Sequence, residues 1–162
     1  MGSILAVAIL LVSLLLGLKE TDHFSQAARE AQLGAMMSFE IEDIQSVETT
    51  VKWCEITIVT TSLRRCVVFG QMGRVITKID LLEVNEIVDR TVHGDLVITF
   101  RPAELPMDQS LIEDFAGTEQ TWYCDGSFVH ELKTPLPSFI LPETEHPGLP
   151  ATLIEYDRTY CN

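Results

Sequence analysis

The residues with the most definite chemistry are the four cysteines, Cys54, Cys66, Cys124 and Cys161. Four cysteines allow three disulfide connectivities. We expect near neighbours to pair, Cys54 with Cys66 and Cys124 with Cys161, because a bridge to Cys161 pins a C-terminal segment that has little else to hold it. In the chain-entropy model, a bridge that closes this C-terminal loop stabilises a protein by roughly 3 to 4 kcal/mol. Buried free thiols are the alternative.

The other reactive side chains form no arrangement that indicates catalysis. The sequence lacks H-E-x-x-H, G-x-S-x-G and the glycine-rich phosphate and dinucleotide loops. It has no C-x-x-C, and the cysteine spacing offers no zinc ligand set with the four histidines. Neighbouring acids such as Glu113 and Asp114 are expected to be solvated charges, with weak calcium binding as the alternative. We therefore expect a protein that is not an enzyme and binds no cofactor or metal.

The net charge excludes one class of partner. The chain of 162 residues carries 24 acidic and 11 basic side chains, a formal charge of -13. This excess repels phosphate backbones, and no run of Lys or Arg offsets it locally. We expect a single folded domain that does not bind nucleic acid.

Residues 1–18 are uncharged and mostly Leu, Ile, Val and Ala. A helix of this length reaches roughly 27 Å, close to the hydrocarbon thickness of about 30 Å, and predicts a membrane span. A buried core helix is the alternative, but it normally keeps a polar stripe. A cleaved signal peptide begins with a basic residue and ends in a small-x-small site, and neither is present. We expect a retained segment, with residue 1 as a mature N-terminus if a leader was removed.

A polar helix is predicted to continue from this segment, because the stretch from Lys19 to Val47 contains no proline and a single glycine. Bulky apolar residues recur along it at steps of four, four and three and predict one packing face: Leu33, Met37, Ile41 and Ile44. A second row at steps of four consists of Ala27, Ala31 and Ala35. Small residues in such a row permit close approach of another helix, although ordinary helix surface is an equal alternative.

From Val51 onward the pattern predicts β-structure. Cys54, Ile56 and Ile58 alternate with polar residues, and glycine-containing turns at Gly70–Gly73 and His93–Asp95 separate further strands. Beyond Arg101 the chain becomes rich in proline. Shorter elements are expected there, namely a helix at residues 109–115 and strands at 121–123, 128–132 and 153–156.

These elements predict an α+β fold in three parts. Residues 1–18 are the transmembrane part of the N-terminal helix, 19–50 its amphipathic extension, and 51–162 a β-rich domain. The long helix would pack on an antiparallel sheet of four to five strands, because this buries the apolar face of each. Disulfide bonds would cross-link the C-terminal region.

The order of these elements resembles the type IV pilin-like superfamily. Residues 35–44, AMMSFEIEDI, are similar to the helix end of minor pseudopilins of the J and PilW type, and residues 27–31 look like the helix of TadE-type pseudopilins. The resemblance implies a minor pilin or pseudopilin. The family's glutamate at the fifth mature position is replaced by Leu5, which points toward a minor or tip subunit.

We therefore expect a membrane-anchored subunit that assembles through Leu5, Ala27, Ala31 and Ala35. Its partners would be the lipid bilayer and other pilin-like subunits, in a pilus-like or secretion filament or its tip. Its domain would lie in the periplasm or outside the cell. One alternative is a single-pass protein whose external β domain binds a partner without polymerising. Another is a thiol-containing scaffold on the cytoplasmic side.

Overall fold

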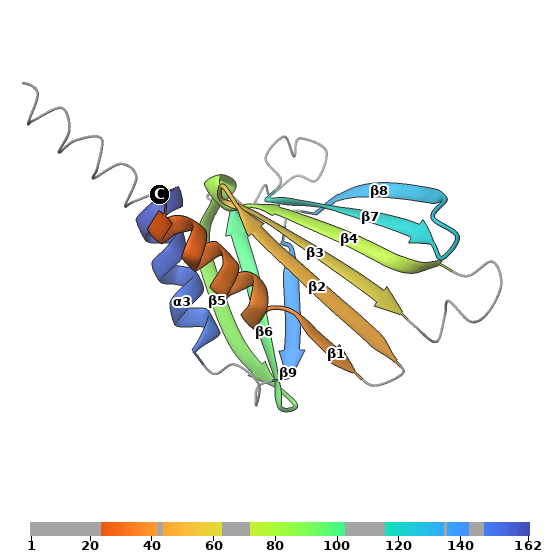
Figure 1. Cartoon of the computed structure of the whole chain (residues 1–162), viewed down its shortest axis with the longest axis horizontal. Coiled ribbons are helices and arrows are strands. Elements are labelled where there is room, and N and C mark those ends of the chain that lie inside the picture. The colour runs from red at the N-terminus through yellow and green to blue at the C-terminus, as the bar shows by residue number, and fades with distance from the viewer. Residues whose placement is uncertain (1–23, 42–43, 63–71, 103–115, 135, 143–147) are drawn as a thin grey trace, which may run out of the picture.

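The structure of the protein is a computed structural model that describes residues 24–41, 44–62, 72–102, 116–134, 136–142 and 148–162. Over these residues, nine strands form two antiparallel sheets, and helices pack beside them (Figure 1). The six-stranded sheet has the order β1-β2-β3-β4-β7-β8, and the three-stranded sheet has the order β5-β6-β9. The strands are β1 (Phe39–Ile41), β2 (Gln45–Lys52), β3 (Glu55–Ser62), β4 (Met72–Asp80), β5 (Val84–Val92), β6 (Asp95–Pro102), β7 (Gly117–Tyr123), β8 (Phe128–Thr134) and β9 (Ser138–Pro142).

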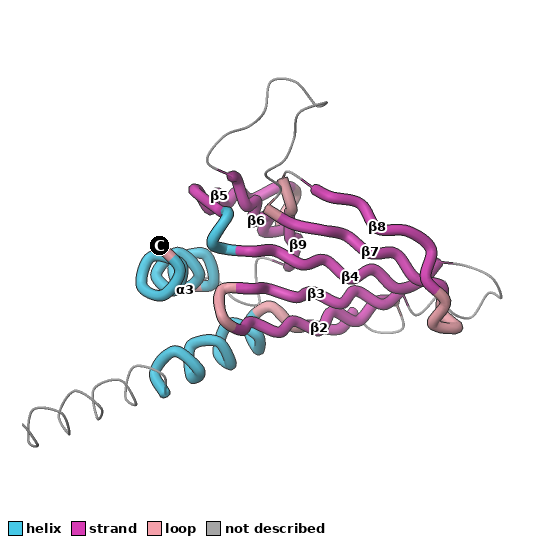
Figure 2. Tube along the Cα trace, turned by 90° about the horizontal axis from the view of Figure 1, so that it is seen from above, coloured by secondary structure: helices cyan, strands magenta, loops and turns pink. Residues whose placement is uncertain are grey.

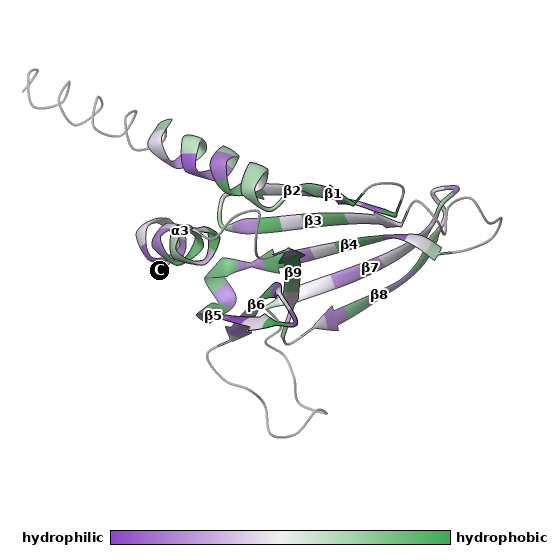
Figure 3. Cartoon of the chain, turned by 90° about the horizontal axis from the view of Figure 1, so that it is seen from below, coloured by the Kyte–Doolittle hydropathy of each residue, from purple (hydrophilic) through white to green (hydrophobic). Residues whose placement is uncertain are grey.

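The six-stranded sheet buries one face at the β2–β4 end. Val51 pairs with Ile56, which pairs with Ile79, so three apolar side chains on neighbouring strands point to the same side. All three are buried, as are Val47, four positions from Val51 on β2, and Ile58, two positions from Ile56 on β3. Hydrophobic and hydrophilic residues accordingly alternate along the strands in Figure 3.

The three-stranded sheet supplies the opposite side of the core. Leu96 pairs with Leu141 and Ile98 with Phe139, and these side chains are buried together with Phe100. The β5–β6 turn has positive φ at both of its central residues, 54° at His93 and 89° at Gly94. Two such residues define the type I′ turn that suits a tight hairpin.

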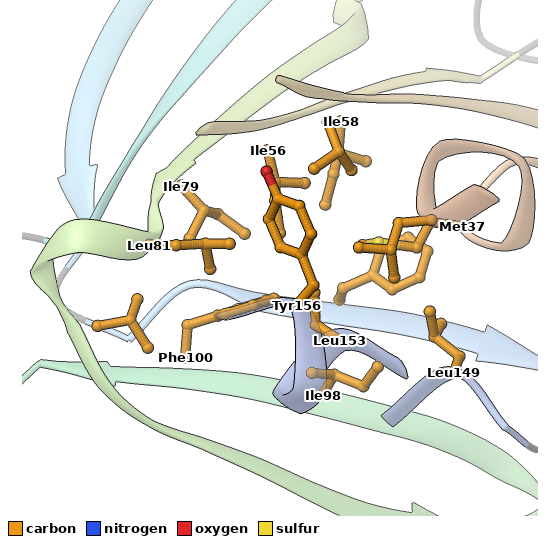
Figure 4. Packing of buried hydrophobic residues seen from close by; sticks show 14 of the residues in the cluster. Met37, Ile56, Ile58, Ile79, Leu81, Ile98, Phe100, Leu149, Leu153 and Tyr156 are labelled. Carbon is orange, nitrogen blue, oxygen red and sulfur yellow. The ribbon is translucent and has the colours of Figure 1, made fainter. Parts of the chain in front are cut away.

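Helical segments complete the core. The helix over residues 24–36 contributes the fully buried Leu33, and Met37 follows directly after it. Figure 2 shows this helix beside β2 and α3 (Leu149–Tyr156), which π-helical η3 (Asp157–Cys161) extends. A short 3-10 helix, η1 (Leu81–Glu83), joins β4 to β5. Figure 4 shows the Tyr156 ring in the middle of the core, where it links both sheets and the helices.

The expected architecture, a long N-terminal helix on one sheet of four to five strands, is wrong. The helix ends at residue 36. Strand β1 and the first part of β2 lie within residues 37–50, which were expected to be the last part of the amphipathic helix. Ser38 terminates the helix, because its hydroxyl donates to the carbonyl of Gly34 at 2.7 Å and accepts from the N–H of Thr49 at 2.8 Å. The β-branched residues from 47 to 51 then favour a strand.

The predicted membrane span lies outside the described residues, and so does Leu5. Among the helices that the structure describes, none is long and apolar enough to cross a bilayer. Residues 70 and 71 of the expected turn are not described, and Met72 and Gly73 belong to β4. The helix expected at 109–115 lies entirely outside the described residues. The span therefore stays a prediction from residues 1–18.

The strand expected at 153–156 is also wrong, because these residues belong to α3. Leu149, Leu153 and Tyr156 are buried at steps of four and three, which is the spacing of one helix face. Pro150 lies in the first turn of α3, where a missing N–H costs no hydrogen bond. The predicted strands at 121–123 and 128–132 are found within β7 and β8.

Candidate functional site

The outer face of the helix over residues 24–36 carries no charge. Its two charged residues, Arg29 and Glu30, are half-buried and turn toward the domain. Phe24 is 81% exposed at the beginning of the described helix. The exposed side chains are all apolar, small or uncharged polar ones: Phe24, Ser25, Ala27, Ala28, Ala31, Gln32 and Ala35. This face is unusual in a chain with a net charge of -13.

Polar contacts hold the N-terminal half of this helix on the domain. Oε1 of Glu30 accepts hydrogen bonds from the backbone N–H of Trp53 at 2.9 Å, the hydroxyl of Tyr156 at 2.9 Å and the amide of Gln26 at 3.1 Å. Arg29 forms an ion pair with Glu155 at 3.4 Å. The helix is thus fixed by Glu30 in its first half and by buried Leu33 in its second.

Burial raises the pKa of the Tyr156 hydroxyl above its ordinary value, and the neighbouring Glu30 carboxylate adds to the rise. The hydroxyl therefore stays protonated at neutral pH and donates to Glu30. It also accepts from the backbone N–H of Cys54 at 3.4 Å. Tyr156 in this way connects the helix over residues 24–36 to the turn between β2 and β3.

That turn consists of Trp53 and Cys54, both in the left-handed region with φ of 53° and 63°. Non-glycine residues in this region cost about 1 to 3 kcal/mol each and persist only where the surrounding structure holds them. Here Glu30 binds the N–H of Trp53, and the carbonyl of Cys54 accepts from the N–H of Leu81 at 2.8 Å. The turn presents the indole of Trp53, which is 62% exposed, at the edge of the helix.

A groove runs between this helix and β2, and we call it the helix–β2 groove. One part, of about 400 Å³, is lined by Gln26, Ala27, Glu30, Lys52 and Trp53. A second part, of about 240 Å³, also contains Glu30 and lies between Ala31 and Ala35 on the helix and residues 49–51 of β2. The three alanines therefore lie along one wall of the groove.

Gly34 sets how closely the helix approaches the strand. A Cβ atom at this position would lie 3.0 Å from the backbone oxygen of Thr49, closer than ordinary van der Waals contact. The hydroxyl of Thr49 also donates to the carbonyl of Met37 at 3.0 Å. The single glycine of the helix thus determines the width of the groove.

The expected pairing of near-neighbour cysteines is wrong. Cys54 is bonded to Cys161, 107 residues away in the sequence, with the two Cα atoms 5.7 Å apart. The bond joins the left-handed turn between β2 and β3 to the end of η3. Cys124 is also disulfide-bonded, and Cys66 lies outside the described residues.

Sequence reasoning placed Ala27, Ala31 and Ala35 together, and the structure keeps all three exposed along one wall. It did not find Glu30 or Tyr156, which are 126 residues apart. No local pattern signals a contact over that distance. Over the described part of the chain, no three His, Cys, Asp or Glu side chains are grouped to hold a metal ion.

Replacing Glu30 tests the contact that holds the helix. In Glu30→Ala the Trp53 N–H and the Tyr156 hydroxyl lose their acceptor, and we expect the free energy of unfolding to fall by about 1 to 3 kcal/mol. Glu30→Gln keeps an acceptor oxygen and is expected to lose less than half as much. Denaturant unfolding of the full chain in detergent measures both values. Equal losses in the two variants would contradict the assigned role.

No protein-family model matches the sequence, and no curated protein or solved structure shows significant similarity to it. Function is therefore inferred from the residues and contacts of this chain.

Proposed function

We propose that this chain is a non-enzymatic subunit, anchored in a membrane by residues 1–18, that assembles with other subunits through the helix over residues 24–36. The observation that carries the proposal is the uncharged outer face of this helix beside the helix–β2 groove. The fully buried parts of protein interfaces are depleted in charge, and a face without charge loses little on leaving water. The small alanine side chains let another backbone approach closely.

The disulfides support a location outside the cytoplasm. The Cys54–Cys161 bond and the bonded state of Cys124 are typical of periplasmic or extracellular proteins, because cytosolic thiols are kept reduced. A membrane anchor followed by an oxidised domain fits a single-pass subunit whose domain faces the periplasm or the exterior. The similarity to minor pilins and pseudopilins, and assembly into a pilus-like filament, stay predictions from the sequence.

A second candidate function is a single-pass protein whose domain binds a partner without polymerising. The exposed indole of Trp53 favours it, because Trp is enriched among the residues that dominate binding energy. Such a protein would bind its partner through the wider part of the groove, between Trp53 and Ala27.

The test of assembly is Ala31→Leu in the full chain in lipid vesicles, with chemical cross-linking as the measurement. An oversized side chain in a close contact costs about 1 to 3 kcal/mol, so we expect the association constant to fall about tenfold. The fold should persist, because position 31 is an exposed helical site that tolerates Leu.

Ala151→Leu is the matched control, since Ala151 is an exposed alanine in α3, away from the outer face of the helix over residues 24–36. We expect it to assemble like the parent chain. Unchanged assembly of Ala31→Leu would remove the support for the helix as the assembly element. A chain that remains monomeric in vesicles yet binds another protein would favour the second candidate.

A further inference from the structure

The helix over residues 24–36 and strand β2 run side by side in opposite directions. Lys52 lines the same part of the groove as Ala27, and Thr50 lines the same part as Ala31. Ser38, just past the helix end, binds the N–H of Thr49 at 2.8 Å. Glu48 therefore lies near the Ala35 end of the helix, and Lys52 lies near the Ala27 end.

Glu48, Thr50 and Lys52 point to one face of β2, because side chains alternate along a strand. All three are exposed. Glu48 and Lys52 are about 13 Å apart along the strand. Among the described residues, ion pairs are formed by Arg29 with Glu155 and by Arg101 with Glu86. Glu48 and Lys52 belong to neither of these pairs. The surface therefore has a negative end at Glu48 and a positive end at Lys52. The half-buried Glu30 carboxylate lies between them and accepts hydrogen bonds from Trp53, Tyr156 and Gln26.

We propose that the partner at this surface is a second copy of this chain, related by a two-fold axis that passes near Ala31 and Thr50. This inference rests on the proposed assembly function and names its partner. The two helices would run antiparallel, with Ala27 of each copy against Ala35 of the other. The same rotation places Glu48 of each copy opposite Lys52 of the second copy, forming two equivalent ion pairs.

The charges favour a second copy in this orientation. A two-fold interface must be complementary to itself, and a patch with opposite charges at equal distances from its centre meets this condition. If the two-fold axis were parallel to the helix, Glu48 and Lys52 of one copy would lie opposite the alanines of the second copy. No ion pair would then form between the copies. Two chains of charge -13 repel one another, so close approach is least unfavourable where the helix face carries no charge.

The first test places a thiol at the proposed axis. Ala31→Cys in the full chain, reconstituted in lipid vesicles and treated with copper phenanthroline, is expected to form a disulfide-linked dimer. Gln32→Cys, exposed on the same helix outside the row, is the control and is expected to cross-link at least about fivefold more slowly. Equal rates for the two variants would overturn the proposed orientation.

The second test exchanges the charges. Lys52→Glu alone and Glu48→Lys alone each place like charges opposite one another at two equivalent positions, and we expect each to weaken dimerisation about tenfold. The double variant Glu48→Lys with Lys52→Glu restores both ion pairs in reverse and is expected to dimerise like the parent. Lys78→Glu, an exposed position on β4, reproduces the net charge change of Lys52→Glu and is expected to have no effect.

The outcomes separate this inference from the proposed function. If Ala31→Leu abolishes assembly but the double charge variant fails to recover it, the helix is an assembly element with a different partner or orientation. If Ala31→Leu leaves assembly unchanged, the proposed function itself fails. If the double variant recovers assembly, this supports both the proposed function and the two-fold dimer, because no unrelated partner would carry the compensating charges.

Discussion

Removing the Cys54–Cys161 disulfide is expected to lower the free energy of unfolding by about 4 to 5 kcal/mol. The bond closes a loop with a sequence separation of 107 residues. In the chain-entropy model, a cross-link over that length removes this much conformational freedom from the unfolded chain. Domains of this size are stable by only about 5 to 15 kcal/mol, so the loss is a large share of the total.

The variant that tests this is the double change Cys54→Ala with Cys161→Ala, which leaves no unpaired thiol at either position. Denaturant unfolding of the full chain in detergent measures the difference from the parent. Thr159→Ala, an exposed position in η3, is the control and is expected to change stability by less than about 0.5 kcal/mol. If the free energy of unfolding of the double variant lay within about 1 kcal/mol of the parent value, removing the bond would give the unfolded chain little additional conformational freedom.

Truncating Tyr156 is expected to cost nearly as much. Its side chain is 1% exposed and is the largest fully buried one described, so Tyr156→Ala leaves a cavity that the surrounding strands cannot fill. Large-to-small changes of this kind lower stability by about 3 to 5 kcal/mol. The loss is measured by denaturant unfolding of the full chain.

Tyr156→Phe separates packing from hydrogen bonding. It keeps the ring and removes the hydroxyl that contacts Glu30 and the N–H of Cys54. We expect a loss of about 1 to 2 kcal/mol. A Phe variant as unstable as the Ala variant would mean that the hydroxyl, rather than the ring, is what the core needs.

The strands were the part of the fold that the sequence predicted best. The alternation at Ile56 and Ile58 and the turn at His93–Asp95 depend on a few neighbouring residues, so the pattern and the structure coincide there. The end of the helix was missed, because Leu33, Met37, Ile41 and Ile44 share a helical spacing. In the structure the first two are fully buried, whereas Ile41 and Ile44 are more than a third exposed beyond the helix.

The candidate site also has one part that the sequence predicted and one part that it did not. The alanine row is a local pattern, and the structure places it on one wall of the groove. The contacts that hold that wall, from Glu30 to Tyr156 and from Cys54 to Cys161, join residues more than a hundred positions apart. Such contacts depend on how the two sheets and the C-terminal helix pack, which no short pattern in a single sequence encodes.

The position of the disulfide also determines how the domain would carry a mechanical load. A force applied between residue 24 and Cys161 passes along the chain to Cys54 and then across the disulfide, because this is the shortest covalent path. Strands β3 to β9 lie inside the closed loop and are bypassed by the tension. Full extension is therefore limited to residues 24–54, about 100 Å at most. A domain built in this way would extend by a limited, fixed distance under pulling while most of its fold stayed intact.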